Sequence, residues 1–261
     1  MLEFARYEGS NRIRGSLYLS IAMSALAALV IWIYPSYSEA FDEDQLLETM
    51  PESMLRLFDI RTMATLEGFL AFELYVFGWI IMLGLYLAYL GAGTVADDVE
   101  RGRMDITLSL PVSRARLVTE KFAALAVPIV LVNVVTPLVV YVSAVAIDEP
   151  IAAADLAAVH LLSIPYLFAC AGIGLAASVA VDRTGIAQRI ALGVTFGLFL
   201  VESLVTDTDY EDLGLVGPSR HYDPNEILLD GTYGLVSMAV LVAMALALLV
   251  GSVLWFRRRD V

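Results

Sequence analysis

Six long apolar runs divide the chain, and polar segments separate them. A helix rises about 1.5 Å per residue, so crossing the hydrocarbon core of a bilayer takes about 20 mainly apolar residues. Runs of 16 to 28 residues therefore predict membrane-spanning helices. We predict an all-α polytopic membrane protein whose six transmembrane helices cover approximately residues 17–34, 69–96, 122–147, 156–181, 190–205 and 235–256.

Prolines and polar positions predict where these helices end or bend. Pro35 should end the first helix, and Pro128 and Pro137 should kink the third, because proline lacks the backbone N–H that a helix uses. Residues 1–15 mix apolar and basic side chains, which predicts a short amphipathic helix on the inner membrane surface. A cleaved signal peptide is the alternative for the first run, although its apolar stretch exceeds the usual length of about 7–15 residues.

The composition is that of a membrane protein with an acidic surface. Hydrophobic residues make up 59% of the chain and its mean hydropathy is +0.76, whereas soluble domains contain about 45–50% apolar residues. The formal charge is −13, and only one of the 16 basic residues is lysine. This bias predicts a halophilic source. Nothing along the chain suggests a separate soluble domain, so we expect residues 1–261 to form a single transmembrane domain.

The basic residues are distributed unevenly between the two sides of the predicted bundle. Six spans place both termini on one side, and thirteen of the sixteen basic residues fall in segments on that side. The positive-inside rule assigns that side to the cytoplasm. We therefore predict a multi-pass protein of the plasma membrane with cytoplasmic N- and C-termini. The segment 97–121 then lies in the cytoplasm, and the acidic segments 37–68 and 206–234 lie outside.

The segment 97–121 is longer and more patterned than a simple connection between two spans. Gly102 should weaken the helix that continues from the second run, and Pro111 should end a short apolar helix. Ser113 can cap a new helix that continues into the third run. The pattern predicts a short helix held at the cytoplasmic surface, either as an interfacial anchor or as a knob that a cytoplasmic partner binds.

The sequence ERGRMDITLSLPVSRARLVTEK, which begins at Glu100, resembles the loop between the second and third spans of ABC-2 type ABC transporter permeases. In that family an acidic residue and Gly precede an apolar helix, and Pro, an apolar residue and Arg follow it, with Lys at the start of the third span. Arg103 departs from the family, which usually has Thr after the Gly. The matching positions are Glu100, Gly102, Leu108, Leu110, Pro111, Val112, Arg114 and Lys121.

The resemblance implies the permease fold of that family and the export of a substrate that the sequence does not identify. It implies two protein partners, a cytoplasmic ABC ATPase subunit and a second permease subunit, which would be either identical or different, in addition to membrane lipid. The segment 97–121 would contain the coupling helix that sits in a cleft of the ATPase. Residues 182–189 would form a second, smaller contact.

The resemblance also implies roles for single residues of the coupling loop. Gly102 and Pro111 would set its geometry, and Leu108 would insert into the ATPase. Glu100 and Arg114 would orient the loop. Lys121 would mark the start of the third span.

The chain contains no nucleotide-binding motif of its own. A P-loop needs G-x-x-x-x-G-K-[ST], in which the lysine reaches the phosphates, but the only lysine is Lys121 and Glu120 precedes it. We therefore expect ATP and Mg²⁺ to bind the partner ATPase and do not predict that this chain is an enzyme. No cofactor, metal ion or nucleic acid is expected on this chain.

Polar and small residues inside the apolar runs are further candidates. Asn133 would line the translocation path or form a hydrogen bond between helices. Gly193 and Gly197 would form a dimer seam or pack against a helix of the same chain. Glu73 and Glu202 lie near the outer ends of their runs and should reach the membrane interface.

Two other classes of function stay open at this point. A secondary transporter commonly has inverted repeats and charged midplane residues, and neither is visible in this sequence. A membrane-integral enzyme would need clustered His, Asp or Glu at one membrane face. Asp97, Asp98 and Glu100 form such a cluster, but the arginines beside them oppose a dense negative site.

Overall fold

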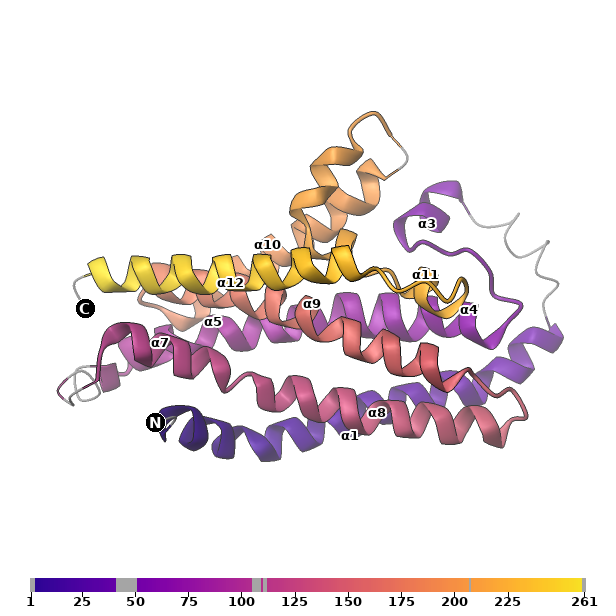
Figure 1. Ribbon diagram of the computed structural model, residues 1–261, viewed down its shortest axis with the longest axis horizontal. Helices are drawn as coiled ribbons and strands as arrows, with labels where there is room; N and C mark the ends of the chain where they lie inside the picture. The colour runs from indigo at the N-terminus through magenta and orange to yellow at the C-terminus, as the bar shows by residue number, and fades with distance from the viewer. Residues whose placement is uncertain (1–2, 41–50, 105–108, 110–111, 207, 260–261) are drawn as a thin grey trace.

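The protein is an elongated bundle of helices (Figure 1), and the computed structural model describes residues 3–40, 51–104, 109, 112–206 and 208–259. All regular structure in these residues is helical. The long helices are α1 (Glu3–Ala40), α5 (Gly84–Glu100), α8 (Ala126–Ala146), α9 (Ala153–Ala180), α10 (Thr184–Val205) and α12 (Leu235–Arg258). The shorter elements are α3 (Glu52–Leu57), α4 (Leu66–Leu70), the π-helix η1 (Ala71–Leu83), α7 (Arg114–Ala123), the 3-10 helices η2 (Glu211–Val216) and η3 (Pro218–His221), and α11 (Pro224–Leu228).

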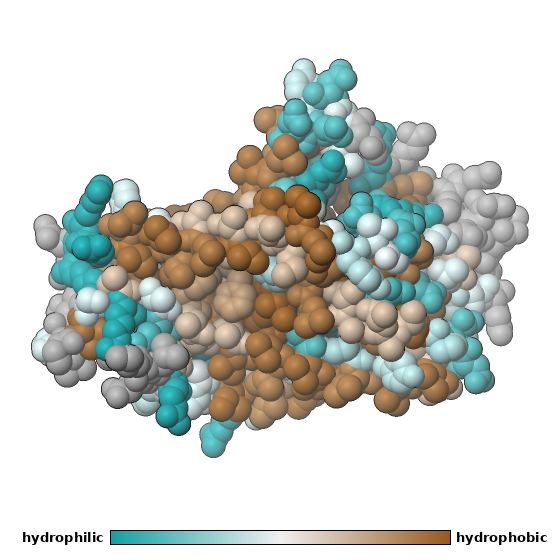
Figure 2. Space-filling model, viewed as in Figure 1, coloured by the Kyte–Doolittle hydropathy of each residue, from teal (hydrophilic) through white to brown (hydrophobic). Residues whose placement is uncertain are grey.

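Among the described residues, six helical segments are long and apolar enough to cross a membrane. They contain all of the predicted runs except the last residue of the third and of the fourth, and several extend beyond the predicted ends. The predicted all-α fold with six transmembrane helices is therefore confirmed. Apolar side chains cover the middle of the bundle, and hydrophilic ones gather towards its ends (Figure 2). The segments are Ala5–Ser38, Leu66–Glu100, Arg114–Ala146, Ala153–Ala180, Thr184–Val205 and Leu235–Arg258.

The two ends of the bundle hold different parts of the chain (Figure 1). The N-terminus of α1, the start of α7 and the C-terminus of α12 lie at one end, which we call the terminal end. The elements α3, α4 and α11 lie at the other, which we call the distal end. The later part of α10 and η2 project from the side of the bundle rather than following its axis.

The first helix corrects two expectations. The separate amphipathic helix predicted for residues 1–15 is not present in residues 3–15, because α1 continues without a break from Glu3 to Ala40. Pro35 does not end the helix either. Tyr34 and Tyr37, on either side of it, both pack against Phe69 with ring centroids 5.6 and 5.0 Å apart, and this packing holds the last turns in place.

The third span is broken where proline requires it. Helix α7 ends at Ala123 and α8 begins at Ala126. Pro128 has no N–H to offer the carbonyl of Ala124, and its ring would clash with that carbonyl in a regular helix. The predicted disturbance at Pro128 is therefore present, whereas α8 continues through Pro137.

Helices α5 and α9 cross at a seam of glycines that the sequence did not reveal. A Cβ atom on Gly91 would clash with the backbone oxygen of Ala171, and one on Gly174 would clash with the backbone oxygen of Ala88. The hydroxyl of Ser178 on α9 also accepts hydrogen bonds from two backbone N–H groups of α5, each at 2.9 Å. Only glycine at these positions permits such a close approach.

Candidate functional site

The predicted coupling residues that the structure describes lie at the terminal end, where the ends of α1, α5, α7, α10 and α12 are joined by hydrogen bonds and ion pairs. Four of the six are described by the structure: Glu100, Gly102, Arg114 and Lys121. The other two, Leu108 and Pro111, lie outside the described residues, so their predicted roles stay predictions.

The backbone on either side of the loop follows the sequence rules. Helix α5 ends at Glu100, and Gly102 then adopts a left-handed conformation with φ of +66° while its N–H donates to the Val99 carbonyl at 3.0 Å. Glycine is favoured here because a side chain is strained at positive φ. At the other end, the Ser113 hydroxyl accepts from the Arg116 N–H at 3.3 Å and caps α7. Both predicted helix boundaries are confirmed.

Lys121 is buried and pairs with two carboxylates, so its charge is not exposed on the loop; we call these three side chains the triad. Its side chain is 6% exposed, and Nζ lies 2.7 Å from a carboxylate oxygen of Glu8 on α1 and 2.7 Å from one of Asp98 on α5. The triad therefore joins three helices at one cation. Sequence reasoning did not identify Glu8 and Asp98 as the partners of Lys121, although Lys121 was recognisable as the only lysine of the chain.

The neighbouring residue Glu120 forms a second link between α1 and α7. One carboxylate oxygen accepts from Arg116 Nε at 2.6 Å, and the other accepts from the backbone N–H of Ala5 at 3.2 Å. Glu120 is itself 3% exposed. A carboxylate near the first N–H groups of a helix is favoured by the helix dipole. The start of α1 is thus held directly against the start of the third span.

Glu100 connects the two segments that the family resemblance assigns to the ATPase. Its carboxylate accepts a hydrogen bond from the backbone N–H of Thr184 at 2.9 Å. Thr184 is the first residue of α10, so the connection from α9 to α10 is shorter than the predicted 182–189, and most of that segment is helical. The position of Glu100 at this helix N-terminus satisfies an otherwise unused donor.

Arg114 is directed at the end of α12. Its guanidinium lies 5.7 Å from the Phe256 ring centroid and donates to the carbonyl of Phe256 at 3.4 Å and to that of Arg259. Arg259 in turn donates to the Val179 carbonyl at 2.6 Å and pairs with Asp182. Cations are stabilised at a helix C-terminus by its unpaired carbonyls. In this structure Arg114 therefore orients α12 within the chain.

Two exposed arginines on either side of Gly102 are held by carboxylates of α5. Arg101 and Arg103 have side chains that are 65% and 50% exposed, and both pair with Asp97, at 2.8 and 2.5 Å. Arg103 also pairs with Asp98 at 2.9 Å. These ion pairs hold the two guanidinium groups in place next to Gly102, beside the loop.

Asn133 lies in a buried polar cluster between η1, α8 and α9. Its Oδ1 lies 2.8 Å from the Ser163 hydroxyl and 3.2 Å from His160 Nδ1, while His160 Nε2 lies 3.1 Å from the Tyr75 hydroxyl. Since Oδ1 can only accept, Nδ1 carries the ring proton and Nε2 accepts from Tyr75. Trp79 Nε1 donates to Ser163 at 3.0 Å. The predicted hydrogen bond between helices is present, and a role in the translocation path stays a prediction.

Gly193 and Gly197 do not pack within the described part of the chain. A Cβ atom on either glycine would meet nothing within 4 Å. The alternative of ordinary packing within the chain therefore finds no support here, and the dimer seam stays a prediction. Glu73 and Glu202 occur in the first turn of η1 and the last turns of α10, and both are partly exposed.

The whole bundle matches a known family. Residues 5–261 fit the family model described as "ABC-2 family transporter protein". Among curated proteins, no relative matches the chain. The family match covers almost the entire chain, and the six apolar helices make it a multi-pass membrane protein. This chain therefore belongs to the ABC-2 family of transporter proteins.

Proposed function

We propose that the chain is the permease subunit of an ATP-driven exporter of the plasma membrane. It works with a separate cytoplasmic ABC ATPase, which binds ATP and Mg²⁺, and with a second permease subunit. The observation that carries the proposal is the set of ion pairs and hydrogen bonds at the terminal end. These contacts attach the residues that flank the loop to α1, α10 and α12.

This network explains how a push on the loop would reach the membrane spans. Lys121 sits near the start of the third span and pairs with α1 and α5, and Glu100 at the end of α5 holds the start of α10. A buried charge that loses its partner is strongly unfavourable. Movement of the loop therefore shifts these helix ends together, which is what coupling to an ATPase requires.

Co-purification from the native host tests the proposal. The tagged wild type, Leu108→Asp and Leu213→Asp are purified in mild detergent, and the accompanying chains are identified by mass spectrometry. Leu213 is 58% exposed in η2, which projects from the side of the bundle away from the terminal end (Figure 1), so it serves as a matched control. We expect a P-loop ATPase with the wild type and with the control, and its loss with Leu108→Asp, because a charge would oppose insertion of the loop.

Two results would contradict the proposal in different ways. If no ATPase accompanies folded wild type, the chain does not act with a separate ATPase subunit. If Leu108→Asp retains as much ATPase as the control, the ATPase partner stands but the loop is not its contact.

A further inference from the structure

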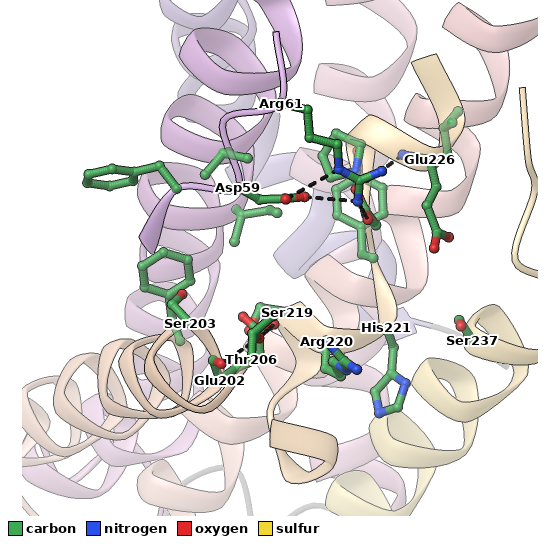
Figure 3. Close-up of a pocket in the computed structure, with 18 of the residues that line it drawn as sticks. Asp59, Arg61, Glu202, Ser203, Thr206, Ser219, Arg220, His221, Glu226 and Ser237 are labelled. Carbon is green, nitrogen blue, oxygen red and sulfur yellow. Dashed lines mark hydrogen bonds and ion pairs between the residues drawn. The ribbon is translucent and has the colours of Figure 1, made fainter. Parts of the chain in front are cut away.

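A cavity of about 620 Å³ lies at the distal end, between residues 55–61, residues 219–224, the middle of η1 and the end of α10 (Figure 3). The membrane spans contribute an apolar patch to its wall, which contains Val76, Ile80 and Phe199, and beside that patch they contribute the polar side chains of Glu202, Ser203 and Ser237. The part that comes from the connecting segments is polar. Binding sites for small molecules have volumes of about 300–1,000 Å³ and combine apolar walls with a few polar groups. The cavity therefore suits an amphipathic molecule.

The cations beside the cavity are already engaged by carboxylates. Arg61 pairs with Asp223 at 2.6 Å, Asp59 at 3.2 Å and Asp230 at 3.3 Å, so three carboxylates surround one guanidinium. Figure 3 shows Arg61 and Asp59 together on one side of the cavity. Arg220 lies 3.9 Å from Glu211. Positive charge is therefore not in excess here.

The carboxylates beside the cavity include two that no arginine contacts directly in an ion pair, although the charge of Arg220 acts on one of them, Glu202. Within the described part of the chain, Glu202 and Glu226 form no ion pair, and the Glu202 carboxylate contacts the Thr206 hydroxyl at 3.3 Å. Glu202 and Thr206 lie together at one edge of the cavity (Figure 3). Glu202 follows Phe199 by one helical turn, which places a carboxylate at the border of the apolar wall.

The surrounding sequence adds negative charge rather than compensating it. The segments 35–68 and 206–234 contain fifteen acidic residues and three arginines. All three arginines line the cavity, and Arg56, like the other two, has an interaction partner within the chain. A positively charged ligand would therefore neutralise part of the excess negative charge at this end of the bundle.

We propose that this cavity binds amphipathic organic cations, with the apolar body against Ile80 and Phe199 and the cationic group next to Glu202. As an assignment of the cargo class, the proposal rests on the proposed function of the chain as a permease. As a binding site, it needs neither the ATPase nor a second subunit.

Binding of a lipophilic cation to the full chain in zwitterionic nanodiscs tests the site. The probe is tetraphenylphosphonium, and tetraphenylborate is the control of the same shape and opposite charge, with empty nanodiscs subtracted. We expect saturable binding of the cation only. Glu202→Gln should weaken it about tenfold, as expected for one partly buried charge pair.

A pair of tryptophan substitutions tests whether the cavity itself is occupied. Ile80→Trp fills the cavity and should abolish binding, whereas Met82→Trp on the same helix should leave it unchanged because Met82 is 53% exposed on the outer surface of the bundle. If Ile80→Trp does not fold, the binding measured for Glu202→Gln tests the site instead, because this substitution removes the charge and leaves the side-chain volume unchanged.

Three outcomes would overturn the site: equal binding of the cation and the anion, unchanged binding in both folded cavity variants, or equal loss in Met82→Trp and Ile80→Trp. The proposed function can fail separately. If the chain binds the cation but co-purifies with no ATPase, the binding site is supported and the proposed role as an ATP-driven exporter is contradicted. If the chain co-purifies with an ATPase but shows no saturable binding of the cation, the proposed exporter is supported and the proposed class of cargo is contradicted.

Discussion

Replacing Lys121 with methionine tests the claim that a buried cation holds three helices together. Methionine keeps much of the side-chain length but removes the charge. The carboxylates of Glu8 and Asp98, each 2.7 Å from Nζ in the wild type, would then lose their shared partner. Arg103→Met is the matched control, because Arg103 also pairs with Asp98, at 2.9 Å, but from a side chain that is 50% exposed.

The structure sets the size of the expected effect. Removing one partner of a fully buried ion pair costs about 3–5 kcal/mol. Here the cost is smaller, because Asp98 keeps its pair with Arg103 and the Glu8 side chain is 27% exposed and can be hydrated. We therefore expect Lys121→Met to lower the free energy of unfolding by about 2 kcal/mol. The exposed control should lower it by at most about 1 kcal/mol.

Equilibrium unfolding in mixed micelles of dodecyl maltoside and dodecyl sulfate measures both values. A double-mutant cycle with Glu8→Gln then isolates the pair, since the two losses should not add when the residues interact. If Lys121→Met and Arg103→Met cost the same, burial does not strengthen the triad. If the cycle shows no coupling between Glu8 and Lys121, α1 is not held by this contact.

Two further predictions concern the α5–α9 seam and the distal ion network. Gly174→Ala should lower the free energy of unfolding by about 3 kcal/mol, because the new methyl group would clash with the backbone of α5, which cannot move aside as a side chain can. The control Gly193→Ala has open space around it and should change the free energy of unfolding by less than about 1 kcal/mol. Equal losses for the two variants in the same unfolding assay would contradict the seam. Burial, and then the negative charge of Asp59, raises the pKa of Asp223 above its ordinary value, although Arg61 opposes the shift. A raised pKa in the folded state means that stability is gained as the pH falls through it, so wild type should gain stability relative to Asp223→Asn between pH 7 and pH 4, and a constant difference would contradict this.

The spans and the loop boundaries were predictable because they depend on local rules. Length and apolar content alone predict six spanning helices. The left-handed turn at Gly102 and the cap at Ser113 follow from the conformations and hydrogen bonds that single residues favour. None of these features needs a partner from elsewhere in the chain.

The contacts between helices were not predictable in the same way. Lys121 and Glu8 are separated by 113 residues, and nothing local marks Glu8 as its partner. Gly193 and Gly197 form a recognisable pair within one helix, but the glycines of the α5–α9 seam are Gly91 and Gly174, which lie on two different helices. A spacing rule applied to one helix cannot find a seam that two helices build together.

The contrast between the two ends of the bundle bears on how each would select its partner. At the terminal end the carboxylates are matched by cations, and Arg101 and Arg103 beside the loop are themselves in ion pairs. At the distal end carboxylates exceed cations, yet this excess cannot steer a ligand in concentrated salt, where the Debye length is about 3 Å at 1 M. If the source is halophilic, as the acidic composition predicts, charge selection has to come from direct contact. Glu202, at the border of the apolar wall, is placed to make that contact with a cation inside the cavity.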